Sequence, residues 1–255
     1  MRNIFSLAVN VIKDAARRKV FYVVFLFGLA VVALSPLLPT FELGARAQFL
    51  RDISLSLISL FGVVLAVILS VGQIPGEVER RTIYNILSKP VSRLQYMAGK
   101  YLGILAALAA ILFIMGLEIL LLIYIRLHVF TPIVFEGVFA VFLESALIAA
   151  FCLALSTFAT VPVNAFASVL FYVLCHVKTG FLNQTLLEGT SGVVKVFAWG
   201  FYYLIPNLEN FNLSLKVGYG GGASATLVLR IAGYAVLFIA VFLVIGYVVF
   251  RQKDL

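Results

Sequence analysis

Long apolar runs that carry almost no charge recur along the chain, and they constrain its fold more than any other feature. A helix needs roughly 20 mainly apolar residues to cross the hydrocarbon core of a bilayer. Because the runs are continuous rather than alternating, they predict helices and not the strands of a membrane barrel. We therefore expect an all-α polytopic membrane protein with six transmembrane helices, at residues 20–38, 53–71, 102–125, 138–161, 163–177 (extending to about 181) and 231–250.

The composition excludes the soluble alternatives. Of the 255 residues, 63% are hydrophobic and only 12% are charged, whereas a soluble domain carries about 25% charged residues. So few charges cannot cover a surface that faces water, which excludes a soluble enzyme and a disordered chain. The excess of 19 Lys and Arg over 11 Asp and Glu is typical of cytoplasmic flanks that meet anionic lipid. No nucleic-acid-binding motif accompanies this excess, so we expect membrane lipid as a partner and no nucleic acid.

The placement of the basic residues predicts an orientation. On the side of the two termini, Lys and Arg crowd next to the ends of the expected spans, as Arg17, Arg18 and Lys19 do before the first one. On the other side they are fewer and lie in longer segments. Cytoplasmic flanks carry this kind of excess, so we expect a multi-pass protein of the cell inner (cytoplasmic) membrane with both termini in the cytoplasm.

Two segments outside the spans also have a membrane pattern, within what we expect to be a single transmembrane domain, 1–255. Residues 1–19 repeat apolar side chains at helical spacing, which predicts a helix along the cytoplasmic surface. As a basic leader before the first apolar run they are too long for a signal peptide, so we expect no cleavage. Residues 193–205 are apolar and rich in aromatics but short for a span. We expect a re-entrant or interfacial element there, within an outer loop 178–228, with a seventh span as the alternative.

The inner loop 72–101, between the second and third spans, concentrates charge as no other segment does. Within it Ile83, Ile86 and Leu87 recur at helical spacing and predict a short amphipathic helix over residues 82–87. Pro90 prevents this helix from continuing, and Ser92 can cap the next one. An ordinary solvated loop is the alternative, but such a loop has no need of an apolar stripe. The stripe therefore predicts a partner groove or the bilayer surface as its contact.

The loop contains three short motifs: Glu77-x-Glu79-Arg80-Arg81-Thr82, Leu87-Ser88-Lys89-Pro90-Val91-Ser92-Arg93 and Gly99-Lys100. Together they resemble the signature of the type-2 ATP-binding-cassette (ABC) permeases. The resemblance spans the whole chain in topology, and at residue level mainly 76–103; Arg81 departs from it, where many relatives carry glycine. It implies about six spans per subunit and a coupling helix that docks onto a separate ATPase. Residues 205–211 further resemble a branch linked to copper-enzyme maturation.

The resemblance implies the permease subunit of an ATP-driven exporter, which acts as a homodimer with two ATPase subunits. The chain is then not an enzyme by itself. No Gly-x-x-x-x-Gly-Lys-Ser/Thr phosphate loop occurs in it, so ATP and Mg are expected on the partner, with no cofactor in this chain. We expect charged residues to orient the docking and Ile83 and Leu87 to fill the partner's groove. The predicted docking set is Glu77, Glu79, Arg80, Arg81, Thr82, Ile83, Leu87, Pro90 and Arg93.

Two carboxylates fall inside expected spans. An ionised carboxylate in hydrocarbon is expensive, so such residues usually face a cavity or a partner. Glu118 in the third span and Glu144 in the fourth are therefore candidates for a substrate or proton path. The alternative is a neutral carboxyl group that is hydrogen-bonded across helices or, for Glu144, an interfacial side chain.

Other polar and small residues have structural interpretations beside functional ones. Cys152, Cys175 and His176 could bind a soft metal ion, but cysteine is also an ordinary core residue, and we predict no metal site.

Small residues at every fourth position allow close helix packing, either within the chain or at a dimer seam. They are Gly62, Ala66 and Ser70 in the second span, and Gly99, Gly103 and Ala107 entering the third.

Two other functions compete with the exporter. A non-transporting membrane anchor or scaffold would keep the docking segment but would need no polar cavity. A secondary transporter should show inverted repeats or broken helices in matching halves, which the sequence does not display.

Overall fold

The computed structural model describes residues 2–17, 21–34, 43–79, 92–181, 205–213, 222 and 224–252. In these ranges the chain forms helices joined by turns, and no strand, which confirms the all-α prediction. The elements are α1 (Arg2–Arg17), α2 (Phe21–Leu34), α3 (Leu43–Ser70), α4 (Pro75–Glu79), α6 (Arg93–Leu127), α7 (Val134–Leu155), α8 (Val161–Phe181), the 3-10 helix η3 (Leu208–Phe211) and α11 (Ala225–Gln252).

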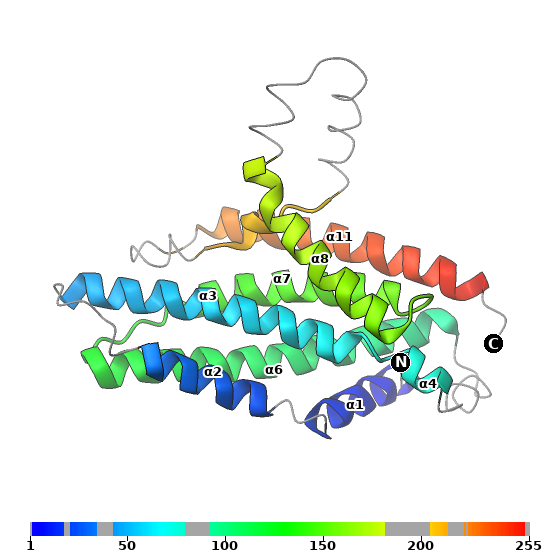
Figure 1. Ribbon diagram of the computed structural model, residues 1–255, viewed down its shortest axis with the longest axis horizontal. Coiled ribbons are helices and arrows are strands. Elements are labelled where there is room, and N and C mark those ends of the chain that lie inside the picture. The colour runs from blue at the N-terminus through cyan, green and yellow to red at the C-terminus, as the bar shows by residue number, and fades with distance from the viewer. Residues whose placement is uncertain are drawn as a thin grey trace, which may run out of the picture.

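Among the described residues, four helical segments are long and apolar enough to cross a membrane: Ala47–Glu79, Arg93–Leu127, Val134–Leu155 and Ala225–Gln252. They lie along the long axis of the molecule, where α3, α7 and α11 run in one direction and α6 runs in the other (Figure 1). The other two expected spans correspond to the shorter apolar helices Tyr22–Ala33 and Val161–Val177. With its 14 residues, α2 rises by only about 21 Å, less than the roughly 30 Å of a hydrocarbon core.

Helix α7 forms the centre of the bundle. It packs against α3, α6, α8 and α11, and 72% of its most apolar stretch is buried, against 11% for α11. Both helices are strongly apolar, so the difference in burial comes from what surrounds them. The exposed apolar side chains of α11 therefore have the character of a surface that meets lipid.

Small residues bring α3 and α7 together. A Cβ atom on Gly62 of α3 would lie 2.7 Å from Ser145 Oγ of α7, and one on Gly137 of α7 would lie 2.7 Å from Leu55 of α3. Ala66 and Ser70 are fully buried on the same helix. The stripe Gly62, Ala66 and Ser70 therefore serves packing within the chain, which decides between the two interpretations left open by the sequence.

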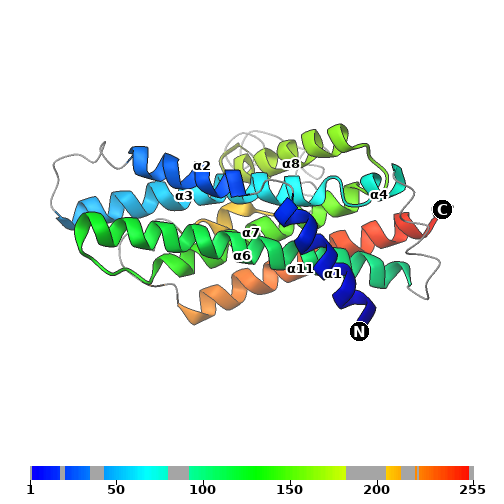
Figure 2. The ribbon, with the colours of Figure 1, turned by 90° about the horizontal axis from the view of Figure 1, so that it is seen from below.

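The amphipathic N-terminal segment forms α1, as its apolar spacing predicts, and crosses α6 (Figure 2). Leu7, Val11 and Ala15 are buried on the face toward the bundle. The crossing depends on Gly103 of α6, where a Cβ atom would lie 2.6 Å from Val11 Cβ and 2.8 Å from the Ala8 carbonyl oxygen. Glycine therefore sets how closely α1 can approach.

The end of the predicted fourth span is a correction. The sequence places it at 161, but α7 ends at Leu155 and a turn precedes α8. The hydroxyls of Ser156 and Thr157 donate to the carbonyls of Leu153 and Ala154, and such local bonds compete with helical ones.

Downstream of this turn, Pro162 lies in the first turn of α8, where its missing N–H is tolerated. Asn164 then ties α8 back to α7, because its Nδ2 donates to the Cys152 carbonyl oxygen at 2.9 Å. Two further predicted elements, the helix at 82–87 and the interfacial segment at 193–205 up to residue 204, lie outside the described residues.

Candidate functional site

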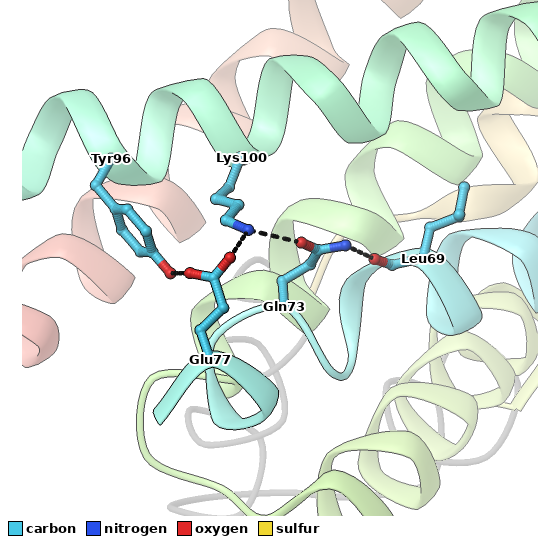
Figure 3. A network of polar contacts seen from close by, with 5 residues as sticks. All are labelled: Leu69, Gln73, Glu77, Tyr96 and Lys100. Atoms are coloured by element: carbon cyan, nitrogen blue, oxygen red, sulfur yellow. Dashed lines mark hydrogen bonds and ion pairs between the residues drawn. The ribbon is translucent and has the colours of Figure 1, made fainter. Parts of the chain in front are cut away.

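Four side chains connect α4 with the beginning of α6, and we call them the anchor network: Gln73, Glu77, Tyr96 and Lys100 (Figure 3). Gln73 and Glu77 are four residues apart on the turn and helix that follow α3, and Tyr96 and Lys100 are four apart on α6. Helical residues at this spacing share a face. Two short polar faces therefore meet each other, next to the ends of residues 80–91.

The network satisfies its polar atoms internally. Lys100 Nζ forms an ion pair with Glu77 Oε1 and donates to Gln73 Oε1 at 3.2 Å. Tyr96 donates its hydroxyl to Glu77 Oε2 at 2.5 Å, and Gln73 donates to the Leu69 carbonyl at 2.7 Å. Lys100 is only 2% exposed. A buried ion pair is tolerated only when such additional hydrogen bonds accompany it, so these contacts fix α4 on α6.

Arg93, the first residue of α6, connects α6 with the end of α11. Its Nη1 donates to the carbonyl oxygens of Phe250 at 2.5 Å and Arg251 at 3.0 Å. Its guanidinium also lies 5.5 Å from the centroid of the Phe250 ring, and that ring stacks on Tyr96. The last carbonyls of a helix lack helical donors and form its negative end, so a cation stabilises them.

The start of α6 follows the predicted capping by Ser92. Ser92 Oγ accepts from the Gln95 backbone N–H at 3.2 Å, and Gln95 Oε1 accepts from the Ser92 backbone N–H at 3.2 Å. This reciprocal pair is a capping box. It fixes where α6 begins, and therefore where residues 80–91 end.

Three of the predicted docking residues lie in the described part of the chain. Glu79 is exposed, whereas Glu77 and Arg93 contact their own chain in the ways just described. The sequence interpretation missed the role of Gln73, Tyr96 and Lys100, although their four-residue spacing on either side of the loop was a usable signal. The remaining docking candidates lie outside the described residues: Arg80, Arg81, Thr82, Ile83, Leu87 and Pro90.

A second polar region lies where α3, α7 and α8 meet the segment around η3. It is a cavity of about 200 Å³, which we call the Glu144 cavity. Its polar lining comes from Ser56 and Ser59 of α3, Glu144 of α7, Tyr172 and His176 of α8, and Asn212 after η3. Leu55, Gly137, Val141, Phe211 and Leu213 complete the wall.

Glu144 is the most buried charged group of this cavity, at 3% exposure. Its Oε2 accepts from Ser59 Oγ at 3.0 Å, and its Oε1 lies 3.5 Å from His176 Nε2. The His176 ring in turn lies 4.6 Å from that of Tyr172. Glu144 therefore faces both the cavity and the His176 side chain.

The other predicted carboxylate is placed elsewhere. Glu118 on α6 lies against Gly28 of α2, where a Cβ atom would be 3.3 Å from Glu118 Oε2. It is half-buried and is not part of the lining of the Glu144 cavity. The structure therefore does not bring the two carboxylates into one path.

The two cysteines and His176, which the sequence offered as metal ligands, make separate contacts. Cys152 Sγ donates to Asn164 Oδ1 at 3.4 Å, and Cys175 is buried. His176 faces Glu144 instead. Across the described ranges, no group of three or more His, Cys, Asp or Glu side chains is arranged to hold a metal ion.

The sequence of the chain was compared with protein families and with known proteins. The family model described as "ABC-2 family transporter protein" matches residues 12–255. A search of the curated proteins found no match. The matched range begins within α1 and includes both the anchor network and the Glu144 cavity.

Proposed function

Because the chain belongs to the ABC-2 family of transporter proteins, we propose that it is the permease subunit of an ATP-driven exporter. In this proposal a separate ATPase hydrolyses ATP, and the permease couples that reaction to movement of substrate across the membrane. The family accounts for a multi-pass membrane component of transport. The coupling and the direction of transport are our extension of it.

The observation that carries the proposal is that both flanks of residues 80–91 are fixed to long helices. On one flank, Glu77 of α4 is paired with Lys100 of α6. On the other, Ser92 caps α6 and Arg93 binds the end of α11. When an ATPase displaces a segment anchored in this way, α3, α6 and α11 move with it, because packed helices move as rigid elements.

The proposed cycle uses this anchoring. Two ATPase subunits close on ATP and Mg, which they bind themselves, and press on residues 80–91 of two permease copies. Ile83 and Leu87 lie in a groove of the ATPase, and the exposed Glu79 helps to orient it together with Arg80 and Arg81. The motion of the anchored helices then changes access to a path between or within the permeases.

The proposed arrangement is a permease homodimer in the cell inner membrane, with both termini and α4 on the cytoplasmic side. The clustering of basic residues at the helix ends supports this orientation. Membership of the copper-enzyme-maturation branch stays a prediction that rests on residues 205–211. The scaffold alternative is less favoured, because a scaffold has no use for a buried polar cavity such as the one around Glu144.

The docking proposal is tested by the double substitution Ile83→Asp and Leu87→Asp. A charged side chain at each apolar docking position would have to be desolvated in the groove, which costs several kcal/mol per unpaired charge. We expect the ATPase that copurifies with the tagged wild-type permease to be lost, together with ATP-dependent transport in reconstituted vesicles. Mass spectrometry of the copurified protein identifies the ATPase.

The matched control places the same two charges at the opposite end of the bundle, as Val129→Asp and Phe130→Asp. Both native side chains are exposed, so the ATPase should copurify as it does with the wild type. If the pair at 83 and 87 left copurification and transport intact, the docking proposal would be wrong.

A further inference from the structure

We propose that the Glu144 cavity binds a small organic amine in its protonated form, and that such an amine is the substrate class of this permease. The second half of this statement rests on the transport function proposed above. The first half concerns only the chain itself. It is carried by the charge, the shape and the wall chemistry of the cavity.

The charge of the cavity favours a cation. Glu144 is buried, and its Oε1 receives no hydrogen bond from the described residues, since His176 Nε2 is 3.5 Å away. The part of the wall that the structure describes contains no lysine or arginine. A carboxylate without a full partner in a low-dielectric site gains most from a cation beside it.

The wall chemistry favours an organic ammonium over a transition-metal ion. A zinc-like ion takes three or more His, Cys, Asp or Glu ligands, and no such group occurs in the described ranges. An ammonium instead carries several N–H donors, which Glu144 Oε1 and a neutral His176 can accept. The Tyr172 and Phe211 rings line the same cavity, and aromatic faces attract organic cations.

The size and the opening of the cavity suit a small molecule. Its volume of about 200 Å³ is several times the roughly 30 Å³ that a water molecule takes in the liquid. Leu55, Val141 and Leu213 provide apolar surface for a hydrocarbon part. Asn212 is exposed and the His176 side chain is 28% exposed, so the cavity communicates with the surface at the η3 end.

The test uses 4-fluorobenzylamine as the probe and 4-fluorobenzyl alcohol as its uncharged counterpart. Binding of each to the purified full-length wild-type chain in micelles is followed by ¹⁹F NMR titration at neutral pH, where the amine is protonated. We expect saturable binding of the amine at least about tenfold tighter than that of the alcohol, as for a hydrogen bond to a charged group. Equal binding of the two probes would overturn the proposal.

Two substitutions locate the binding. Glu144→Gln removes the charge, and Val141→Phe fills the cavity without touching the carboxylate; each should weaken amine binding at least about tenfold. The control is Glu136→Gln, the same change on the same helix but outside the cavity wall, which should leave binding unchanged. Amine binding that stays equal in every folded variant would place the probe elsewhere and refute the site.

The outcome is separable from that of the docking proposal. The amine titration needs no ATPase, and the copurification experiment needs no amine. If the amine does not bind in the cavity but the ATPase copurifies, the proposed substrate class is wrong and the proposed permease function stands. If the amine binds but no ATPase copurifies, the binding site stands and the proposed docking of an ATPase is wrong.

Discussion

Lys100 is a charged side chain enclosed by the bundle, so its neighbours decide whether it can stay there. Its ammonium is matched by the Glu77 carboxylate and the Gln73 amide oxygen. Removing one partner of such a pair leaves a charge without compensation, which is far more costly than removing both. The anchor network is therefore expected to behave as a unit under mutation.

We predict that Glu77→Gln lowers the stability of the purified chain by about 2 kcal/mol or more, because Lys100 then keeps a buried charge. The Glu77 side chain is 20% exposed, which keeps the expected loss below that of a fully enclosed pair. The midpoint of thermal unfolding, followed by circular dichroism in micelles, should fall by several degrees.

Glu79→Gln is the control for this prediction. It makes the same change two residues further on, at an exposed position, and should shift the midpoint little. The double variant Glu77→Gln with Lys100→Met should recover part of the loss, since it removes the uncompensated charge. Equal midpoints for the two single variants would contradict the role given to the network.

Local residue chemistry was predictable from the sequence, whereas partnerships across helices were not. Ser92 and Gln95 form a cap because Gln95 stands three positions after Ser92, and that spacing can be read directly from the sequence. Glu144 and His176 lie on different helices and meet only through packing. The sequence could single out Glu144 as a costly charge, but His176 and Ser59 became its neighbours only in the folded chain.

At the scale of elements, the contact between α1 and α6 depends on the absence of a side chain. We predict that Gly103→Ala weakens this packing by about 1–3 kcal/mol, because the new methyl group meets the backbone of α1 at Ala8 and the Val11 Cβ atom. The loss should exceed the gain of about 1 kcal/mol that alanine brings to a helix interior. The thermal unfolding midpoint checks it.

Gly233→Ala in α11 is the matched control. A Cβ atom there meets nothing within 4 Å, so only the helix propensity acts and the midpoint should stay or rise. A rise for both glycine variants would mean that α1 is not packed on α6 in the way described.

The ends of the elements show why the helix boundaries were only partly predictable. The beginning of α6 follows from a strong local cap, and the structure confirms it. The end of α7 at Leu155 follows from weaker signals, the Ser156 and Thr157 hydroxyls, inside a stretch that is otherwise mainly apolar. A span predicted from hydropathy alone runs past such a turn, because most of the residues around it are apolar.

At the scale of the whole molecule, the directions of the helices place the end of α4, the beginning of α6 and the end of α11 together (Figure 1). The turn between α6 and α7 lies at the other end. If the first of these ends is cytoplasmic, as proposed, two exposed positions should differ in their access from outside the cell. The residues Glu79 and Phe130 are exposed at the two ends.

We predict that Phe130→Cys reacts with a membrane-impermeant maleimide in intact spheroplasts, whereas Glu79→Cys reacts only after the membrane is disrupted. The native cysteines, Cys152 and Cys175, are buried, so the unsubstituted chain serves as a background of low labelling. The reverse pattern would invert the orientation and place residues 80–91 where no cytoplasmic ATPase could reach them.

The contact of Arg93 with α11 has a consequence for sequence change. Arg93 binds main-chain oxygens of Phe250 and Arg251, so the hydrogen bonds do not depend on which side chains stand there. They depend instead on helical phase: each inserted or deleted residue turns the following carbonyls by about 100° around the axis. A substitution at the end of the last helix can therefore keep these hydrogen bonds, whereas an insertion or deletion within that helix would lose them.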